Sequence, residues 1–417
     1  MSSSHARLAA TAALLAFIAA PLAAQRRASP YAGDTANTQI KEMVSRLSLD
    51  HYKATIKGLT KFGDRRQGTA RNRAALDWIE AQLKSYGCTN THRLTYNYAP
   101  RPRRARNTQR PPLTAAQREA FRRARENRRG AGGSRARGNR GPTGVNRDSL
   151  KQPDPTLRAL DTPPSVPGER QDLYCTKIGS VHPDEMYIVS GHMDGIGWGQ
   201  AANDDGSGTA LVMELARVFS MPDVKTNVSI RFILWNNEET GLNGSRAYVE
   251  QRAALQGKED PAGSGKYPEP KWLGMIQHDM MMFDHGMPDA NGKVSKTQRP
   301  EADVNIEFQS TSKFAEGAEK LAWIFRDANE NYATDYPAAV GPHMTNTDSA
   351  PFQDLVPAIT LRENQRGQQI GAGWDPNWHQ PTDVFSTYSD KDFRLGLNAA
   401  QTTLGAVATL AGAHLTR

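Results

Sequence analysis

From residue 171 onward, short apolar runs alternate with longer amphipathic stretches. The apolar runs have the length and composition of buried strands, and they lie at 186–190, 228–235, 272–281, 304–308 and 358–361. The stretches between them repeat apolar residues every three or four positions, which predicts helices at 208–219, 241–254, 312–331 and 391–413. Strands that alternate with helices form largely parallel sheets covered on both faces. The fold class expected is therefore α/β, as a three-layer α/β/α domain with a mixed, largely parallel sheet.

The first part of the chain adds helices and one strand to this domain. Residues 36–87 show helical periodicity in two segments, the second of which ends at Gly87. Residues 91–98 then alternate in polarity as a strand does, and 172–178 also has strand character. The only two cysteines, Cys88 and Cys175, each adjoin one of these strands. If the strands are neighbours, we expect a disulfide between the two cysteines.

Residues 1–24 have the pattern of a signal peptide. A weakly basic start precedes an apolar run at 8–20, and Ala23 and Ala24 offer small residues for cleavage. The run is too short for a membrane span, and no later run approaches the length of about 18 residues that a span needs. We expect cleavage after residue 24, export to the periplasm or the medium, and no transmembrane segment. Residues 25–100 would then begin the mature catalytic domain, and 170–417 would complete it.

Residues 101–169 interrupt the domain with a sequence rich in Arg, Pro and Gly. Between residues 101 and 147 there are 15 Arg and two acids, Glu119 and Glu126, so this segment carries +13 while the whole chain carries +8. Large apolar residues are nearly absent, which predicts a disordered insertion. We expect this insertion to be either a solvated loop or a segment whose residues 101–147 make an electrostatic contact with an anionic surface. Nucleic acid is not expected as a partner, because Phe121 is the only aromatic residue available for base stacking.

Polar side chains gather just past the ends of the predicted strands, where parallel sheets place their sites. Transition metals prefer imidazole and carboxylate ligands that converge from different elements. Each cluster also has an ordinary structural explanation, such as helix capping or a solvated turn. The clustered residues are His192, Asp194, Asp204, Asp205, Glu238, Glu239, His278, Asp279 and, in a later loop, His379.

Individual residues in these clusters suit different tasks. Asp194 lies two positions after His192, and a carboxylate at that spacing can orient a metal-binding imidazole. Of two adjacent glutamates, one can bind a metal while the other acts as a general base. Asp279 stands in an apolar run, where a charge is costly unless it is paired or bound to metal. We expect its neighbour His278 to pack or to support the site rather than to ligate a metal.

Five motifs occur in one order along the chain: His192-Met193-Asp194, 203–208, 235–245, His278-Asp279-Met280 and 379–383. In this order they resemble the co-catalytic di-zinc aminopeptidases, clan MH exopeptidases whose relatives include carboxypeptidase Q, glutaminyl cyclase and the transferrin-receptor ectodomain. The resemblance covers residues 36–411 apart from the insertion. It implies two zinc ions as cofactors and peptides as substrates. The implied ligands are His192 and Asp279 for one ion, Glu239 and His379 for the other, and Asp204 for both.

The resemblance also implies roles for residues that do not bind metal. Glu238 would be the general base, Asp194 would support His192, and Asp383 would support His379. Substrate contacts are expected from Glu238, Asp348 or Glu363 to a free amine, and from Arg362 or Arg366 to a free carboxylate. Trp378 stands where some relatives place a tyrosine that polarises the carbonyl. The 348–352 motif keeps its aspartate and lacks the family's following histidine, for which His343 is a candidate replacement.

The activity implied is that of an exported zinc aminopeptidase, which hydrolyses N-terminal residues from peptides. A carboxypeptidase Q-like dipeptidase is the main alternative, because 189–192 and 197–201 also resemble that branch. Glutaminyl cyclase and a catalytically inactive binding ectodomain are further alternatives. The inactive alternative is disfavoured, since relatives of that kind lose the ligands that this chain retains.

Overall fold

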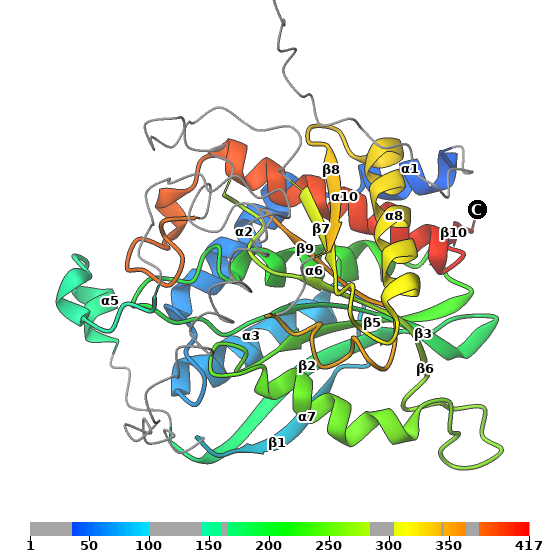
Figure 1. The fold of residues 1–417 in the computed structure, drawn as a ribbon, viewed down its shortest axis with the longest axis horizontal. Coiled ribbons are helices and arrows are strands. Elements are labelled where there is room, and N and C mark those ends of the chain that lie inside the picture. The colour runs from blue at the N-terminus through cyan, green and yellow to red at the C-terminus, as the bar shows by residue number, and fades with distance from the viewer. Residues whose placement is uncertain are drawn as a thin grey trace, which may run out of the picture.

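The computed structural model describes residues 36–100, 144–160, 166–283, 304–342, 346–363 and 375–416. The predicted signal peptide at 1–24 and residues 101–143 of the predicted insertion lie outside these ranges, as do His343 and Arg366. The ribbon in Figure 1 shows a large sheet with helices packed on it. A second, two-stranded sheet is formed by β4 (Val224–Lys225) and β10 (His414–Leu415).

The sheet has eight strands in the order β1-β2-β5-β3-β6-β9-β7-β8. The inner strands β5, β3, β6 and β9 are parallel neighbours, whereas β1 with β2, β2 with β5, and β7 with β9 are antiparallel. This mixed, largely parallel sheet is the one predicted. Its strands are β1 (His92–Tyr98), β2 (Gly168–Lys177), β3 (His182–His192), β5 (Val228–Trp235), β6 (Lys271–His278), β7 (Val304–Phe308), β8 (Ala338–Pro342) and β9 (Ala358–Arg362).

Both faces of the sheet are covered, because alternate side chains of β5 enter different clusters. Phe232 and Leu234 belong to the larger core cluster, whereas Ile233 and Trp235 belong to the smaller one. Residues of α7 (Asn243–Arg252) contribute to the smaller cluster. The larger cluster is formed with α1 (Thr38–Ser45), α2 (Leu49–Leu59), α3 (Ala70–Ser85), α6 (Gly206–Phe219), α8 (Ala315–Tyr332) and α10 (Asp390–Leu410). The three-layer prediction is therefore confirmed.

Some predicted boundaries are wrong by a few residues, and two have physical reasons. The strand predicted at 272–281 ends at His278, because Met280 adopts a left-handed φ of 62° that no strand accommodates. The last helix ends at Leu410 rather than at 413, just before Gly412 with its φ of 61°. Strand β8 was not predicted, since its sequence contains Gly and Pro and is half exposed. Among the helices of the described ranges, none combines the length and hydrophobicity that a membrane crossing requires.

The predicted disorder of 101–169 is wrong for its last part. Residues 144–160 contain a 3₁₀ turn at Ser149–Lys151 and the short helix α5 (Pro155–Ala159), which Asp154 caps. Strand β2 begins at Gly168, inside the predicted insertion. The low content of large apolar residues misled the prediction, since a few buried amide side chains hold this segment against the domain.

The predicted disulfide between Cys88 and Cys175 is present, with 6.0 Å between the two Cα atoms. Cys88 follows α3, and Cys175 lies in β2, so the bridge fixes the end of this helix to the strand next to the edge strand β1. Both residues are buried in the larger core cluster.

Replacing both Cys88 and Cys175 by Ser is expected to lower the free energy of unfolding by about 2–4 kcal/mol. The bridge joins positions 87 residues apart, and its removal frees the unfolded chain from that constraint. Denaturant unfolding of the two proteins measures the difference. Reduced wild type serves as the control and should match the variant; equal stability of the oxidised wild type and the variant would contradict the prediction.

Candidate metal centre

Three adjacent parallel strands deliver polar side chains to the same edge of the sheet. His192 is the last residue of β3, Glu238 and Glu239 follow β5, and Asp279 follows β6. The register pairs His192 with Trp235 across β3 and β5, which aligns the two strand ends. The fold therefore brings together residues that lie far apart in the sequence.

Asp204 and His379 complete this edge from two loops. The loop with Asp204 precedes α6, and the loop with His379 precedes α10. Each oxygen of Asp204 faces a different imidazole: Oδ1 lies 3.3 Å from Nε2 of His192, and Oδ2 lies 2.9 Å from Nε2 of His379. Nε2 of His379 also lies 2.8 Å from Oε2 of Glu239.

The five predicted ligands form two groups that share one aspartate. His192, Asp204 and Asp279 have potential ligand atoms within 4.8 Å of one another, and so do Asp204, Glu239 and His379. Each group offers one imidazole nitrogen and carboxylate oxygens, a donor set that suits zinc. The geometry places Asp204 where it could bridge two ions.

The charge distribution of the site also suits divalent cations. Burial would lower the pKa of His192, but the surrounding carboxylates, Glu238 foremost, raise it well above its ordinary value. Burial raises the pKa of Glu239 to about 7, and the charge of Asp204 adds to the effect. Oε1 of Glu239 has no hydrogen-bond partner among the described residues. Bound cations would relieve this excess of buried negative charge.

Glu238 belongs to neither group, as expected of a base rather than a ligand. It is half-buried, and its backbone N–H donates to Oδ1 of Asp194 at 3.0 Å. Burial raises the pKa of its carboxyl well above the ordinary value; the charge of His192 opposes this, and that of Asp348 reinforces it.

Asp194 supports the site differently from the prediction. Its carboxylate lies 3.9 Å from Nδ1 of His192, which is too far for a hydrogen bond. Its backbone carbonyl is the group that lies 3.0 Å from this nitrogen. The predicted spacing assumed that the strand continues past His192, whereas β3 ends there. The Asp194 carboxylate instead holds the backbone of Glu238.

The acidic residues predicted to bind substrate are buried and already have partners. Asp348 is fully buried and accepts a hydrogen bond from Oγ of Ser245 at 2.5 Å. Burial raises the pKa of Asp348 to about 7. Glu363 accepts from the backbone of Met282 at 3.0 Å and of Phe283 at 2.6 Å. Each side chain also keeps one oxygen without a hydrogen-bond partner among the described residues, Oδ2 of Asp348 and Oε1 of Glu363, and their contact with a substrate amine stays a prediction.

Arg362, predicted to bind a substrate carboxylate, also has hydrogen-bond partners within the protein. Arg362 is 2% exposed, and its Nη2 donates to Oδ2 of Asp279 at 2.7 Å. It also donates to the carbonyl of Asn346 at 3.3 Å. Arg362 therefore orients a candidate metal ligand through Nη2. Its Nη1 has no hydrogen-bond partner among the described residues, and its contact with a substrate carboxylate stays a prediction.

Trp378 and Asp383, two neighbours of His379 in the sequence, make contacts other than those expected. The indole of Trp378 stacks on the His379 ring, with centroids 3.9 Å apart and planes inclined by 24°. Asp383, predicted to support His379, accepts instead from the backbone of Asn203 at 2.8 Å and of Asp204 at 3.1 Å. His278 lies outside both ligand groups, as predicted.

Arg65 is a supporting residue that no sequence pattern indicated. It is completely buried, and its guanidinium donates to the backbone carbonyls of Met193 at 2.7 Å, Gln200 at 2.8 Å and Ala201 at 2.8 Å. These carbonyls belong to the chain that connects His192 with Asp204. Arg65 therefore fixes the loop between two candidate ligands.

Replacing Arg65 by Met is expected to lower the free energy of unfolding by about 3 kcal/mol or more, because several buried carbonyls lose their donor. Thermal or denaturant unfolding measures the loss. Arg73→Met is the matched control, since Arg73 is exposed and donates one long bond of 3.4 Å to Gly68. Equal stability of the two variants would show that Arg65 does not have this role.

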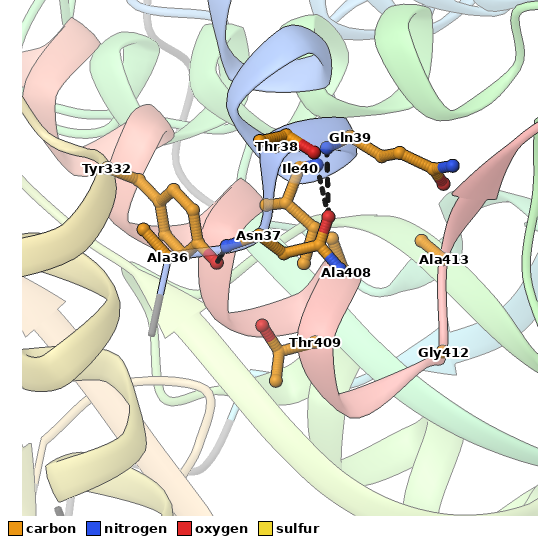
Figure 2. Close-up of a pocket in the computed structure, with 10 residues that line it drawn as sticks. All are labelled: Ala36, Asn37, Thr38, Gln39, Ile40, Tyr332, Ala408, Thr409, Gly412 and Ala413. Carbon is orange, nitrogen blue, oxygen red and sulfur yellow. Dashed lines mark hydrogen bonds between the residues drawn. The ribbon is translucent and has the colours of Figure 1, made fainter. Parts of the chain in front are cut away.

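A separate hollow of about 680 Å³ lies near the start of the described chain. Figure 2 shows Asn37, Thr409 and Tyr332 around it, with the backbone N–H of Asn37 donating to the Tyr332 hydroxyl at 3.0 Å. Its lining is formed by α1, α8 and the end of α10, and it includes none of the candidate ligands.

The sequence is similar to those of known peptidases. The sequence model of peptidase family M28 matches residues 175–400. Aminopeptidase YwaD of Bacillus subtilis is 45% identical over 69 residues, which cover 16% of this chain and 14% of that protein. Carboxypeptidase Q of Xenopus laevis is 28% identical over 147 residues, which cover 35% of this chain and 29% of that protein. The chain thus spans less than a third of the length of either relative.

Solved structures share the fold at low sequence identity. BSAP, described as a zinc aminopeptidase from Bacillus subtilis, superposes with a TM-score of 0.56 at 16% identity. The match covers 87% of this chain and 95% of BSAP. At this identity the likeness concerns the architecture.

Proposed function

Because this chain belongs to peptidase family M28, we propose that it is a zinc-dependent exopeptidase, and specifically an aminopeptidase that removes N-terminal residues from peptides. The observation that carries the proposal is the pair of ligand groups that share Asp204. A single-metal site, as in the glutaminyl cyclase alternative, requires only one such group. A non-catalytic ectodomain requires neither.

The residues present fit two zinc ions. His192 and Asp279 would hold one ion, Glu239 and His379 the other, and Asp204 both. When bound, the ions would polarise the scissile carbonyl and lower the pKa of a bound water molecule to near neutrality.

Glu238 is the residue that would move the proton. Its carboxylate would accept a proton from the attacking water and deliver it to the nitrogen of the leaving amine as the peptide bond breaks. The Asp194 carboxylate, which accepts from the backbone N–H of Glu238, would hold this base in place. Of the two adjacent glutamates, Glu238 would thus act as the base and Glu239 as a metal ligand.

The charge of the centre favours a substrate with a free amine. Carboxylates outnumber cations among the described residues of the site, and Arg362 is already paired with Asp279. A protonated amine would be attracted by this surplus of negative charge, whereas a free carboxylate would be repelled by it. This favours aminopeptidase over dipeptidase action.

The proposal is tested with short peptides in matched pairs, with free or acetylated N-termini and free or amidated C-termini, incubated with the zinc-loaded protein. Mass spectrometry should show stepwise loss of N-terminal residues from every free-amine peptide, whatever its C-terminus. Cleavage confined to dipeptides with both ends free would identify a carboxypeptidase Q-like dipeptidase. Cyclisation of N-terminal glutamine without hydrolysis would identify a glutaminyl cyclase.

We also propose that the protein acts outside the cytoplasm after removal of residues 1–24. The disulfide between Cys88 and Cys175 supports this, since such bonds persist in oxidising compartments. Amino-terminal sequencing of protein from the periplasm or medium should begin at Gln25. An intact terminus on cytoplasmic protein would contradict the proposal.

A further inference from the structure

Residues 144–152, which we call the strap, lie against two loops of the candidate metal centre. One loop, 195–200, connects His192 with Asp204, and the other, 377–383, carries His379. The strap belongs to the segment for which the sequence predicted only disorder. Two of its polar side chains, Asn146 and Gln152, are buried.

Gln152 joins the two loops with a single amide. Its Nε2 donates to the carbonyl of Trp198 at 2.6 Å and to the carbonyl of Pro381 at 3.0 Å. Its Oε1 accepts from the backbone of Asp154 at 3.0 Å, which fixes the amide orientation. The side chain is 2% exposed, so these bonds are shielded from water.

Asn146 makes a second link between the same loops. Its backbone N–H donates to the carbonyl of His379 at 3.0 Å. Its Nδ2 donates to the carbonyl of Gly197 at 3.3 Å. In return, Nε2 of Gln380 donates to the carbonyl of Gly144 at 2.8 Å. The strap therefore contacts the backbone of a candidate ligand directly.

His379 depends on such backbone support for two reasons. Its φ of 56° is left-handed, a conformation that non-glycine residues keep only when their surroundings enforce it. Its Nδ1 has no hydrogen-bond partner among the described residues, so the usual bond that orients a metal-binding imidazole is not found there. Orientation of the ring is left to the backbone and to the stacked Trp378.

The two loops also touch each other closely enough to transmit a displacement. A Cβ on Gly197 would lie 2.3 Å from the carbonyl carbon of His379, so the backbones are in direct contact. Trp198, whose carbonyl Gln152 binds, has a left-handed φ of 72°. Loss of the strap contacts would therefore let both loops relax and move His379.

We propose that Asn146 and Gln152 are positioning residues of the metal centre, which hold His379 in the orientation that a divalent cation at the Asp204–Glu239–His379 group requires. The inference rests on the proposed function, since it assumes that this group binds zinc. No contact joins the strap to His192 or Asp279 among the described residues. Because the strap binds the His379 backbone directly, its loss should weaken the ion at this group more than the other ion.

The test is zinc binding by metal-free protein, measured by titration calorimetry. Gln152→Glu keeps the shape of the side chain and replaces both donors by an acceptor. Wild type should bind two zinc ions, whereas the variant should bind one of them about 10–100-fold more weakly and the other with a clearly smaller loss of affinity. His379→Ala identifies which of the two sites is affected.

Gln251→Glu is the matched control, because Gln251 is exposed and its Nε2 donates to the carbonyl of Thr95 at 3.0 Å, away from the centre. It should bind zinc as wild type does. Gln152→Ala, which removes the donors without adding a charge, is the second variant if Gln152→Glu does not fold.

Unchanged affinities in a folded Gln152 variant would overturn the inference, and so would equal weakening of both sites. Failure of both Gln152 variants to fold would also overturn it, since the strap would then serve stability rather than the metal. If the wild type bound no zinc, the proposed function itself would be refuted. If the wild type and the variant both bound two ions with equal affinity, only the inference about the strap would be refuted.

Discussion

Replacement of Glu238 by Gln is expected to lower kcat by about 10²–10⁴-fold while leaving zinc binding unchanged. The amide cannot accept a proton from water, but it has the same shape and can occupy the same place. Because Glu238 belongs to neither ligand group, the metal content should stay the same. Steady-state hydrolysis of a free-amine peptide and metal analysis of the same sample measure the two quantities.

Two further substitutions make this result specific. Glu250→Gln, on the exposed part of α7, should have normal activity and metal content. Glu239→Gln should weaken zinc binding, because Glu239 is a candidate ligand with an unpaired buried oxygen. Turnover near the wild-type rate in zinc-loaded Glu238→Gln would remove Glu238 from the role of base.

Replacement of Asp204 by Asn is expected to weaken binding of both ions together, by at least about 100-fold, and to abolish hydrolysis with them. Groups that only support a ligand already contribute about 10–100-fold to metal affinity, and a bridging ligand should contribute no less. An amide carries no charge and has only one oxygen, whereas both oxygens of Asp204 face imidazoles. Titration of the metal-free variant with zinc measures the loss.

Variants that alter only one of the two ligand groups serve as the comparison for Asp204→Asn. Asp279→Asn and His379→Ala each alter one ligand group, so each should weaken one ion and spare the other. If Asp204→Asn lost only one ion, Asp204 would be an ordinary ligand and the account of a shared aspartate would be wrong.

The sequence predicted the buried sheet well, for a reason visible in β5. The strand predicted at 228–235 is observed with the same bounds, and all its residues are buried. A strand covered on both faces is apolar throughout, so it stands out from its surroundings. The five motifs, through their resemblance to the di-zinc aminopeptidases, then indicated the five candidate ligands, which the fold brings together.

Other features depend on backbone geometry that composition does not reveal. The early end of β3 turns the carboxylate of Asp194 away from His192 and brings its carbonyl there instead. Arg65 acts entirely through backbone carbonyls, which have no sequence signature. Gln152 lies in a segment of low apolar content, where one buried amide provides the order that a hydrophobic cluster would provide elsewhere.

The most direct measurement of the central claim is anomalous diffraction at the zinc edge from crystals of the zinc-loaded protein. Two zinc peaks are expected on either side of Asp204, one beside His192 and Asp279 and the other beside Glu239 and His379. A single peak at Asp204, or zinc bound only elsewhere, would contradict a two-metal exopeptidase centre.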